Sequence, residues 1–277
     1  MSGTYLSDGA TLAFQDSGAG LPVVFLHPTP IDHDYWRPLC EQLTGVRAIV
    51  PDLRGHGRSE LGTKLPVGGF ARVPDAAVLT MAQLGTDVLT LLDHLQLASA
   101  VFVGCSIGGY VLLELWRRAP DRMRGLAFVC SKPQPEAEAN LAKRAENIAK
   151  ARAGEIAALF DGMAQVDVGA STHARNPAIV AEVRSHMTLT VEALTAVQAG
   201  LAIRPDSVPT VATISVPVLA IAGGGDVVVS VAEMEAFRTA PGGCAFHLLP
   251  EAGHFAAYEQ PQAVAALLSP WLRQFSG

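Results

Sequence analysis

Short apolar runs alternate with longer amphipathic stretches along most of this chain. Uninterrupted apolar residues at 22–26, 100–103 and 126–130 predict strands that are buried on both faces. Residues 81–97 carry apolar side chains at helical spacing, so they predict an amphipathic helix. Further strands are expected at 4–6, 11–16, 48–53, 217–222 and 245–249. Because strands and helices alternate, we expect eight strands in a mostly parallel sheet flanked by helices, an α/β fold.

The alternation stops in the second half of the chain, where helical patterns continue without a convincing strand. We therefore expect residues 132–213 to form an inserted helical cap, or lid, over the strand ends. Residues 1–131 and 214–277 would then form the core. Helices are expected within the cap at 136–153, 154–163, 177–186 and 191–201, and outside it at 35–43, 231–237 and 260–275.

A candidate nucleophile lies between the strand at 100–103 and the helix that follows it. Gly104-Cys105-Ser106-Ile107-Gly108 fits the pattern G-x-S-x-G in a strand-turn-helix context. Such a turn holds the serine in a strained backbone conformation and presents its hydroxyl at a helix N-terminus. The pattern predicts that Ser106 is a catalytic nucleophile. The alternative is a tight turn in which Ser106 only caps the helix.

Two polar residues follow later predicted strands and supply the partners that a serine nucleophile needs. Asp226 ends a glycine run after the strand at 217–222, and His254 lies on the loop after the last strand. Ligands bind at the carboxyl ends of parallel strands, so Ser106, Asp226 and His254 are expected to meet there. His254 would act as the base and Asp226 would orient it. Taken singly, His254 could be a surface histidine and Asp226 a turn residue.

An oxyanion hole requires two backbone N–H donors near the nucleophile. The amide of Ile107, directly after Ser106, is the first candidate. Thr29 is the second, because it carries the first N–H beyond Pro28 in the loop after the strand at 22–26. A rigid turn without function is the alternative for this loop.

Composition narrows the partners and the location. The 277 residues carry a net charge of −6, which gives no reason to expect nucleic acid or an anionic membrane as partner. No signal peptide and no apolar stretch of about 18 residues is found, so a cytoplasmic location is expected. The four cysteines are widely spaced, and no zinc-ligand spacing or phosphate-binding loop is present, so we expect no metal and no cofactor. A small-molecule substrate is the expected partner, and the sequence predicts no oligomeric state.

These motifs together resemble the α/β-hydrolase superfamily, in the branch of small esterases, enol-lactonases and cofactor-free haloperoxidases. The matching segments are LHPTP at 26–30, PDLRGHGRS at 51–59, GCSIGG at 104–109, AGGGD at 222–226 and AGHF at 252–255. The resemblance implies the α/β-hydrolase fold and a structural role for Asp52 and His56. Pro28 departs from the family, which usually carries glycine there to allow a close backbone approach.

We therefore expect a serine hydrolase that cleaves a small, largely apolar carboxylic ester or lactone through an acyl-enzyme on Ser106. The apolar pocket is expected because residues 134–212 are rich in Ala, Leu and Val. Arg144, Arg152 and Arg175 could bind a substrate carboxylate or could lie on solvated helix faces. The same triad could instead support C–C bond hydrolysis, perhydrolysis, haloperoxidation or cofactor-free oxygenation. A non-catalytic receptor that closes its cap on a ligand is the alternative outside enzymes.

Overall fold

A computed structural model describes residues 2–275, so residues 1 and 276–277 of the expected core segments lie outside the described part. Eight strands form one sheet in the order β1-β2-β4-β3-β5-β6-β7-β8. β2 pairs antiparallel with β1 and β4, and all other neighbours are parallel. The strands are β1 Ser2–Ser7, β2 Ala10–Gly18, β3 Leu21–Leu26, β4 Val46–Pro51, β5 Ala100–Cys105, β6 Met123–Val129, β7 Val218–Gly223 and β8 Cys244–Leu249. The predicted mostly parallel, eight-stranded sheet is confirmed.

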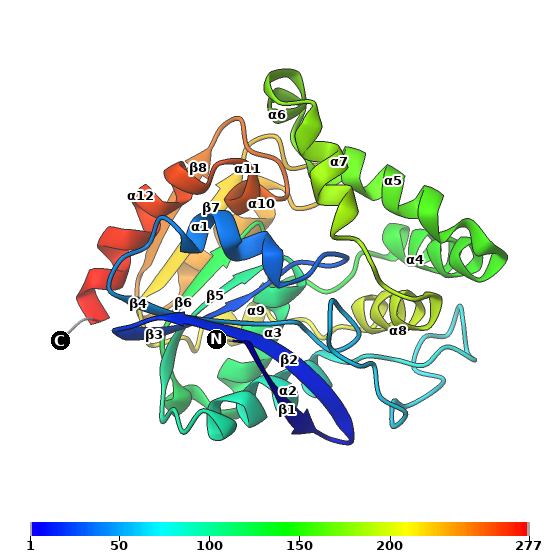
Figure 1. Ribbon diagram of the computed structural model, residues 1–277, viewed down its shortest axis with the longest axis horizontal. Helices are drawn as coiled ribbons and strands as arrows, with labels where there is room; N and C mark the ends of the chain where they lie inside the picture. The colour runs from blue at the N-terminus through cyan, green and yellow to red at the C-terminus, as the bar shows by residue number, and fades with distance from the viewer. Residues whose placement is uncertain (1, 276–277) are drawn as a thin grey trace.

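Helices cover both faces of this sheet (Figure 1). α1, α11 and α12 pack together on one face, and α2 packs against α3 on the other. The bounds of these elements are η1 His33–Trp36, α1 Arg37–Cys40, α2 Met81–His94, α3 Ile107–Arg118, η2 Pro120–Arg122, α10 Val231–Met234, η4 Glu235–Thr239, α11 Ala256–Glu259, α12 Pro261–Leu272 and η5 Arg273–Phe275.

The chain between β6 and β7 is helical. Figure 1 shows α4, α5, α7 and α8 gathered at one end of the sheet. α4 packs on α8, and α5 packs on α7. The bounds are α4 Glu138–Lys150, η3 Ala151–Glu155, α5 Ile156–Asp167, α6 Ala170–Arg175, α7 Ala178–Ser185, α8 Val191–Ala202 and α9 Val208–Val211. The short helices α6 and α9 were not predicted, since each is too short to show a periodic pattern.

Two expected helices differ from the structure in extent. The expected break between 153 and 154 is a widened helical turn, in which Gly154 adopts φ 88° and kinks the chain between α4 and α5. α5 then continues to Asp167, beyond the predicted end at 163. The expected helix at 35–43 is shorter, because the four-residue helix α1 ends at Cys40 before a turn at Gly45.

The central strands bring the candidate residues together at the carboxyl-terminal end of the sheet. β5 and β7 are buried along their whole length, as the continuous apolar runs predicted. Four parallel strands lie next to one another, in the order β3, β5, β6 and β7. The loops that follow them therefore lie at the same end of the sheet. These loops carry Thr29, Ser106 and Asp226.

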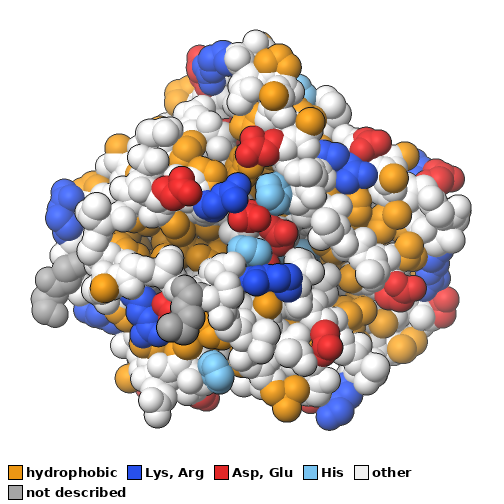
Figure 2. Space-filling view, viewed as in Figure 1, with side chains coloured by type: hydrophobic (Ala, Val, Ile, Leu, Met, Phe, Trp, Pro, Cys, Tyr) orange, Lys and Arg blue, Asp and Glu red, His pale blue; other side chains and the backbone are white. Residues whose placement is uncertain are grey.

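One face of the molecule carries side chains of both charges (Figure 2). Figure 2 shows basic and acidic side chains interspersed with hydrophobic ones on the face viewed. Within residues 2–275, no helix combines the length and apolar character needed to cross a membrane.

Candidate active site

Ser106 lies at the junction of β5 and α3 with φ 51° and ψ −118°. A Cβ on Gly108 would lie 2.2 Å from the Leu26 carbonyl oxygen, and one on Gly104 would lie 2.6 Å from the Gly108 carbonyl carbon. Both glycines are therefore needed for α3 to approach the strands so closely. A positive φ at a serine costs roughly 1–3 kcal/mol and is often found at functional sites. The turn has the geometry expected of a nucleophile elbow.

His254 and Asp226 form a buried pair. His254 Nδ1 donates to Asp226 Oδ2 at 2.9 Å, and the two side chains are 3% and 0% exposed. Asp226 Oδ1 accepts from the amides of Val228 and Val229 at 2.8 and 2.9 Å. His254 Nε2 makes no hydrogen bond within residues 2–275, so it is free to accept a proton from a neighbouring hydroxyl.

Electrostatics favour the charged form of both partners. Burial alone would lower the pKa of His254, but the charge and hydrogen bond of Asp226 raise it above the ordinary value. Burial would raise the pKa of Asp226, but the charge and hydrogen bond of His254 and the two backbone amides lower it. The carboxylate therefore stays ionised and stabilises a proton on the imidazole.

Ser106 and His254 line one cavity of about 100 Å³. The lining residues from the strand-end loops and α3 are Thr29, Pro30, Ser106, Tyr110, Val228 and His254, and those from α4, α5 and α8 are Arg144, Met163, Asp167, Gln198 and Leu201. The structure thus brings Ser106, His254 and Thr29 together, with Asp226 behind the histidine.

Thr29 is fixed by a chain of hydrogen bonds. His56 Nδ1 lies 3.0 Å from the Arg54 carbonyl and donates to it, so the Thr29 hydroxyl donates to His56 Nε2 at 2.9 Å. Burial lowers the pKa of His56 to about 3, which keeps the ring neutral. Among the residues that the structure describes, the amides of Thr29 and Ile107 donate no hydrogen bond. Both N–H groups are available to a ligand.

Asp52 holds the neighbouring loop. Its carboxylate accepts from the backbone amide of His33 at 3.0 Å, from His33 Nδ1 at 2.7 Å and from the amide of Arg58 at 3.1 Å. Burial opposes ionisation, but the hydrogen bonds and charge of His33 lower the pKa of Asp52 to about 2. These contacts give Asp52 and His56 structural roles.

The helical segment contributes three polar groups to the cavity, of which the sequence indicated only Arg144, as one of three candidate arginines. Arg144, Asp167 and Gln198 all line it. Arg152 instead pairs with Asp75 at 3.0 Å on the surface, and Arg175 pairs with the exposed Glu251. The cavity is therefore more polar than expected, since the average composition of 134–212 does not show which helix faces turn inward. Arg144 is the only one of the three arginines weighed that lines the cavity.

Glu259 connects the histidine loop to the helical segment. Its carboxylate accepts from the amide of Gly253 at 3.1 Å, from the amide of Gly169 at 3.1 Å and from Thr172 Oγ1 at 2.6 Å. It thereby fixes the residue before His254 relative to the start of α6. No motif in the sequence indicated this role.

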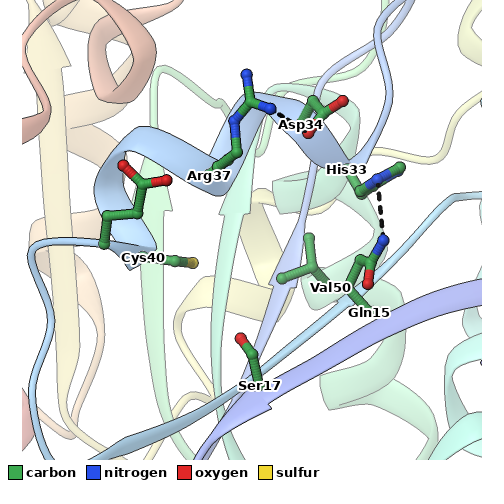
Figure 3. A pocket seen from close by; sticks show the side chains of 8 residues that line it. Gln15, Ser17, His33, Asp34, Arg37, Cys40 and Val50 are labelled. Atoms are coloured by element: carbon green, nitrogen blue, oxygen red, sulfur yellow. Dashed lines mark hydrogen bonds and ion pairs between the residues drawn. The ribbon is translucent and has the colours of Figure 1, made fainter. Parts of the chain in front are cut away.

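A second, larger cavity of about 380 Å³ lies away from Ser106 and His254 (Figure 3). Gln15 and Arg37 are among its lining residues. Gln15 Nε2 lies 3.4 Å from His33 Nε2, and Arg37 Nη1 lies 3.5 Å from Asp34 Oδ1. Asp34 also belongs to a cluster with Asp32 and His186, the one group within residues 2–275 whose ligand atoms could hold a metal ion. Ser17 and Cys40 also line this cavity, but within residues 2–275 neither side chain is hydrogen-bonded to a histidine, and burial raises the pKa of Cys40 to about 12. The smaller cavity, which holds Ser106 beside the His254–Asp226 pair, is therefore the candidate active site.

Comparisons with known proteins identify relatives of this chain. A sequence model described as the alpha/beta hydrolase family matches residues 23–267. 3-Oxoadipate enol-lactonase 2 of Acinetobacter baylyi is 30% identical over 82% of this chain and 79% of that protein. A malate-bound esterase from Thermogutta terrifontis is 30% identical, with a TM-score of 0.89 over 100% of both chains. An epoxide hydrolase of Caballeronia sordidicola is 33% identical, but the match spans 43% of this chain and only 34% of that protein.

Proposed function

Because this chain belongs to the alpha/beta hydrolase family, we propose that it cleaves small carboxylic esters or lactones through an acyl-enzyme on Ser106. The predicted α/β-hydrolase fold and the resemblance to esterases and enol-lactonases are confirmed. The observation that carries the proposal is the 2.9 Å bond between His254 Nδ1 and Asp226 Oδ2, with Ser106 and His254 in one cavity. A cavity of about 100 Å³ favours small substrates, since drug-sized ligands need roughly 300–1,000 Å³.

In the first half-reaction, His254 Nε2 accepts the Ser106 proton while Oγ attacks the carbonyl carbon of the substrate. Asp226 keeps the imidazole in the tautomer that presents Nε2 and stabilises the imidazolium. The oxyanion accepts hydrogen bonds from the unused amides of Ile107 and Thr29, where α3 begins. His254 then returns the proton to the leaving alkoxide as the C–O bond breaks.

In the second half-reaction, water replaces the alcohol. His254 removes a proton from the water, whose oxygen attacks the acyl carbon, and the proton passes to Ser106 as the acyl–Oγ bond breaks. The carboxylic acid and the free serine result. With a lactone, the alcohol and the acid are parts of one product.

Residues 132–213 form the cap in this proposal, and residues 1–131 and 214–277 form the core. The proposal is supported by the cavity, which is lined by strand-end loops and by α4, α5 and α8. The partial match to an epoxide hydrolase does not change the proposed function, because an epoxide hydrolase of this fold needs a carboxylate where this chain has Ser106.

Turnover of a panel of esters and lactones tests the proposal. We expect Ser106→Ala to lower kcat by about a million-fold with an unchanged melting temperature. Ser185→Ala, which removes an exposed hydroxyl that bonds only to the Glu182 carbonyl, is the matched control and should leave kcat unchanged. Activity of Ser106→Ala within about tenfold of the wild type would contradict the proposal.

A further inference from the structure

Three polar side chains from three different helices line the cavity around Ser106. They are Arg144 from α4, Asp167 at the end of α5 and Gln198 from α8. None of them is needed for the Ser106, His254 and Asp226 chemistry. Their hydrogen-bonding state shows what kind of ligand group they can accept.

Arg144 carries a positive charge that is only partly neutralised. Its Nε and Nη2 contact Glu136 Oε2 at 2.7 and 2.6 Å, and Arg204 Nη1 contacts the same oxygen at 3.0 Å. Two guanidinium groups therefore share one buried carboxylate, and the group as a whole keeps one net positive charge. A guanidinium has five N–H donors, so Arg144 retains donors for a ligand.

Gln198 is oriented by Arg144. Its Oε1 accepts from Arg144 Nη1 at 3.0 Å, which leaves the amide Nε2 as the free end of a side chain that is 2% exposed. Within residues 2–275, this nitrogen donates to no acceptor. The group that it offers to the cavity is a hydrogen-bond donor.

Asp167 is 7% exposed, and its carboxyl group makes no hydrogen bond within the described part of the chain. The groups near it are His254, Asp226 and Glu259, with Arg144 lining the same cavity. Burial raises the pKa of Asp167 to about 7; His254 opposes the rise, and the other two carboxylates add to it. Below that pH the carboxyl is protonated and is a third donor.

We propose that Arg144, Gln198 and Asp167 form a carboxylate-binding subsite, so that the substrate is an ester or lactone whose acyl part carries a carboxylate. The inference rests on the proposed hydrolysis at Ser106. The N–H groups that Arg144 does not use on Glu136 and Gln198, the free Nε2 of Gln198 and the protonated carboxyl of Asp167 are donors beside a net positive charge. Together they complement a carboxylate, which only accepts hydrogen bonds. A plain alkyl acyl group would offer no acceptor to any of these donors.

The test compares monomethyl glutarate with the neutral ester methyl hexanoate, whose acyl chain has similar length. We expect the wild type to hydrolyse the anionic ester with a kcat/KM at least about tenfold higher. Arg144→Met should lower that value by about 10- to 100-fold and leave methyl hexanoate within about threefold. Arg152→Met, which removes an arginine paired with Asp75 on the surface, is the matched control and should change neither.

A second variant keeps the test valid if Arg144→Met folds poorly. Above about pH 7 the ionised Asp167 repels the substrate carboxylate, so the wild-type KM for monomethyl glutarate should rise there while that for methyl hexanoate does not. Asp167→Asn keeps an N–H donor at every pH and should abolish this rise. It should also raise the melting temperature at pH 8, because it removes a buried ionised group without a partner.

The outcomes separate this inference from the proposed function. Hydrolysis of methyl hexanoate at least as fast as of monomethyl glutarate would overturn the subsite while leaving Ser106 catalysis intact. An equal loss with both esters in Arg144→Met, or an unchanged pH dependence of KM in Asp167→Asn, would also overturn it. No hydrolysis of any ester, and no reaction of Ser106 with a fluorophosphonate, would instead overturn the proposed function.

Discussion

Asp226 has both carboxylate oxygens engaged, one by His254 Nδ1 and the other by the amides of Val228 and Val229. An amide in its place cannot accept at every one of these positions and would favour the wrong imidazole tautomer. We therefore expect Asp226→Asn to lower kcat by about ten-thousand-fold. Glu251→Gln is the control, because Glu251 is exposed and pairs with Arg175. A nearly silent Asp226→Asn would show that another group orients His254.

The pH dependence of hydrolysis follows from the environment of His254. The base must be neutral to accept the Ser106 proton, and Asp226 raises its pKa above the ordinary value of 6.5. Activity should therefore fall as pH decreases, with the midpoint of kcat/KM for a neutral ester above 6.5. A midpoint below that of an exposed histidine would contradict the assignment.

The sequence predicted Ser106, Asp226 and His254 as a set because each lies just after a strand. Residues that follow parallel strands lie at the same end of the sheet, so their place in the chain is enough to predict that they meet. Asp167 and Gln198 could not be found in this way. They belong to helices whose inward faces depend on how α4, α5 and α8 pack, and no local pattern specifies that packing. Arg144 was one of three arginines that the sequence did not distinguish.

At the scale of elements, the approach of α3 to the sheet depends on Gly108. A Cβ there would meet the Leu26 backbone at 2.2 Å, and backbone cannot move aside cheaply. We expect Gly108→Ala to lower the free energy of unfolding by about 2 kcal/mol or more and to impair activity. Denaturant unfolding with an activity assay measures both.

Gly162→Ala is the matched comparison. Gly162 lies inside α5 with open space around its Cα, so alanine should stabilise the helix by up to about 1 kcal/mol. If both substitutions had the same effect, close packing at the elbow would not be the reason for Gly108.

An element could be predicted where its sequence carries a long apolar pattern, and not where its bounds depend on a few residues. Buried strands such as β5 and β7 follow from continuous apolar runs, and α2 follows from apolar periodicity over fourteen residues. The kink at Gly154 and the short helices α6 and α9 depend on single backbone angles and tertiary contacts. Their sequences carry no period long enough to detect.

At the scale of the whole molecule, one buried ion pair joins three distant segments. Arg54 contacts both oxygens of Asp87 at 2.8 and 2.6 Å and donates to the Ser7 carbonyl at 2.8 Å. It thus connects the loop after β4 to α2 and β1. We expect Arg54→Met to lower the free energy of unfolding by about 3–5 kcal/mol, because Asp87 would be left buried without its charged partner.

Chemical denaturation measures this loss. Replacing both partners, as in Arg54→Met with Asp87→Leu, should recover much of it, since no lone charge stays buried. The exposed pair of Arg152 and Asp75 is the comparison, and Arg152→Met should change stability by less than about 1 kcal/mol. An effect of Arg54→Met as small as that would show that the pair does not hold the segments together.

The most direct test of the central claim is labelling with a fluorophosphonate probe, followed by intact mass and peptide mapping. The account predicts one adduct, on Ser106, which is absent in Ser106→Ala and forms far more slowly in Asp226→Asn. No adduct on the folded protein, or an adduct on another serine, would contradict a Ser106 nucleophile activated by His254.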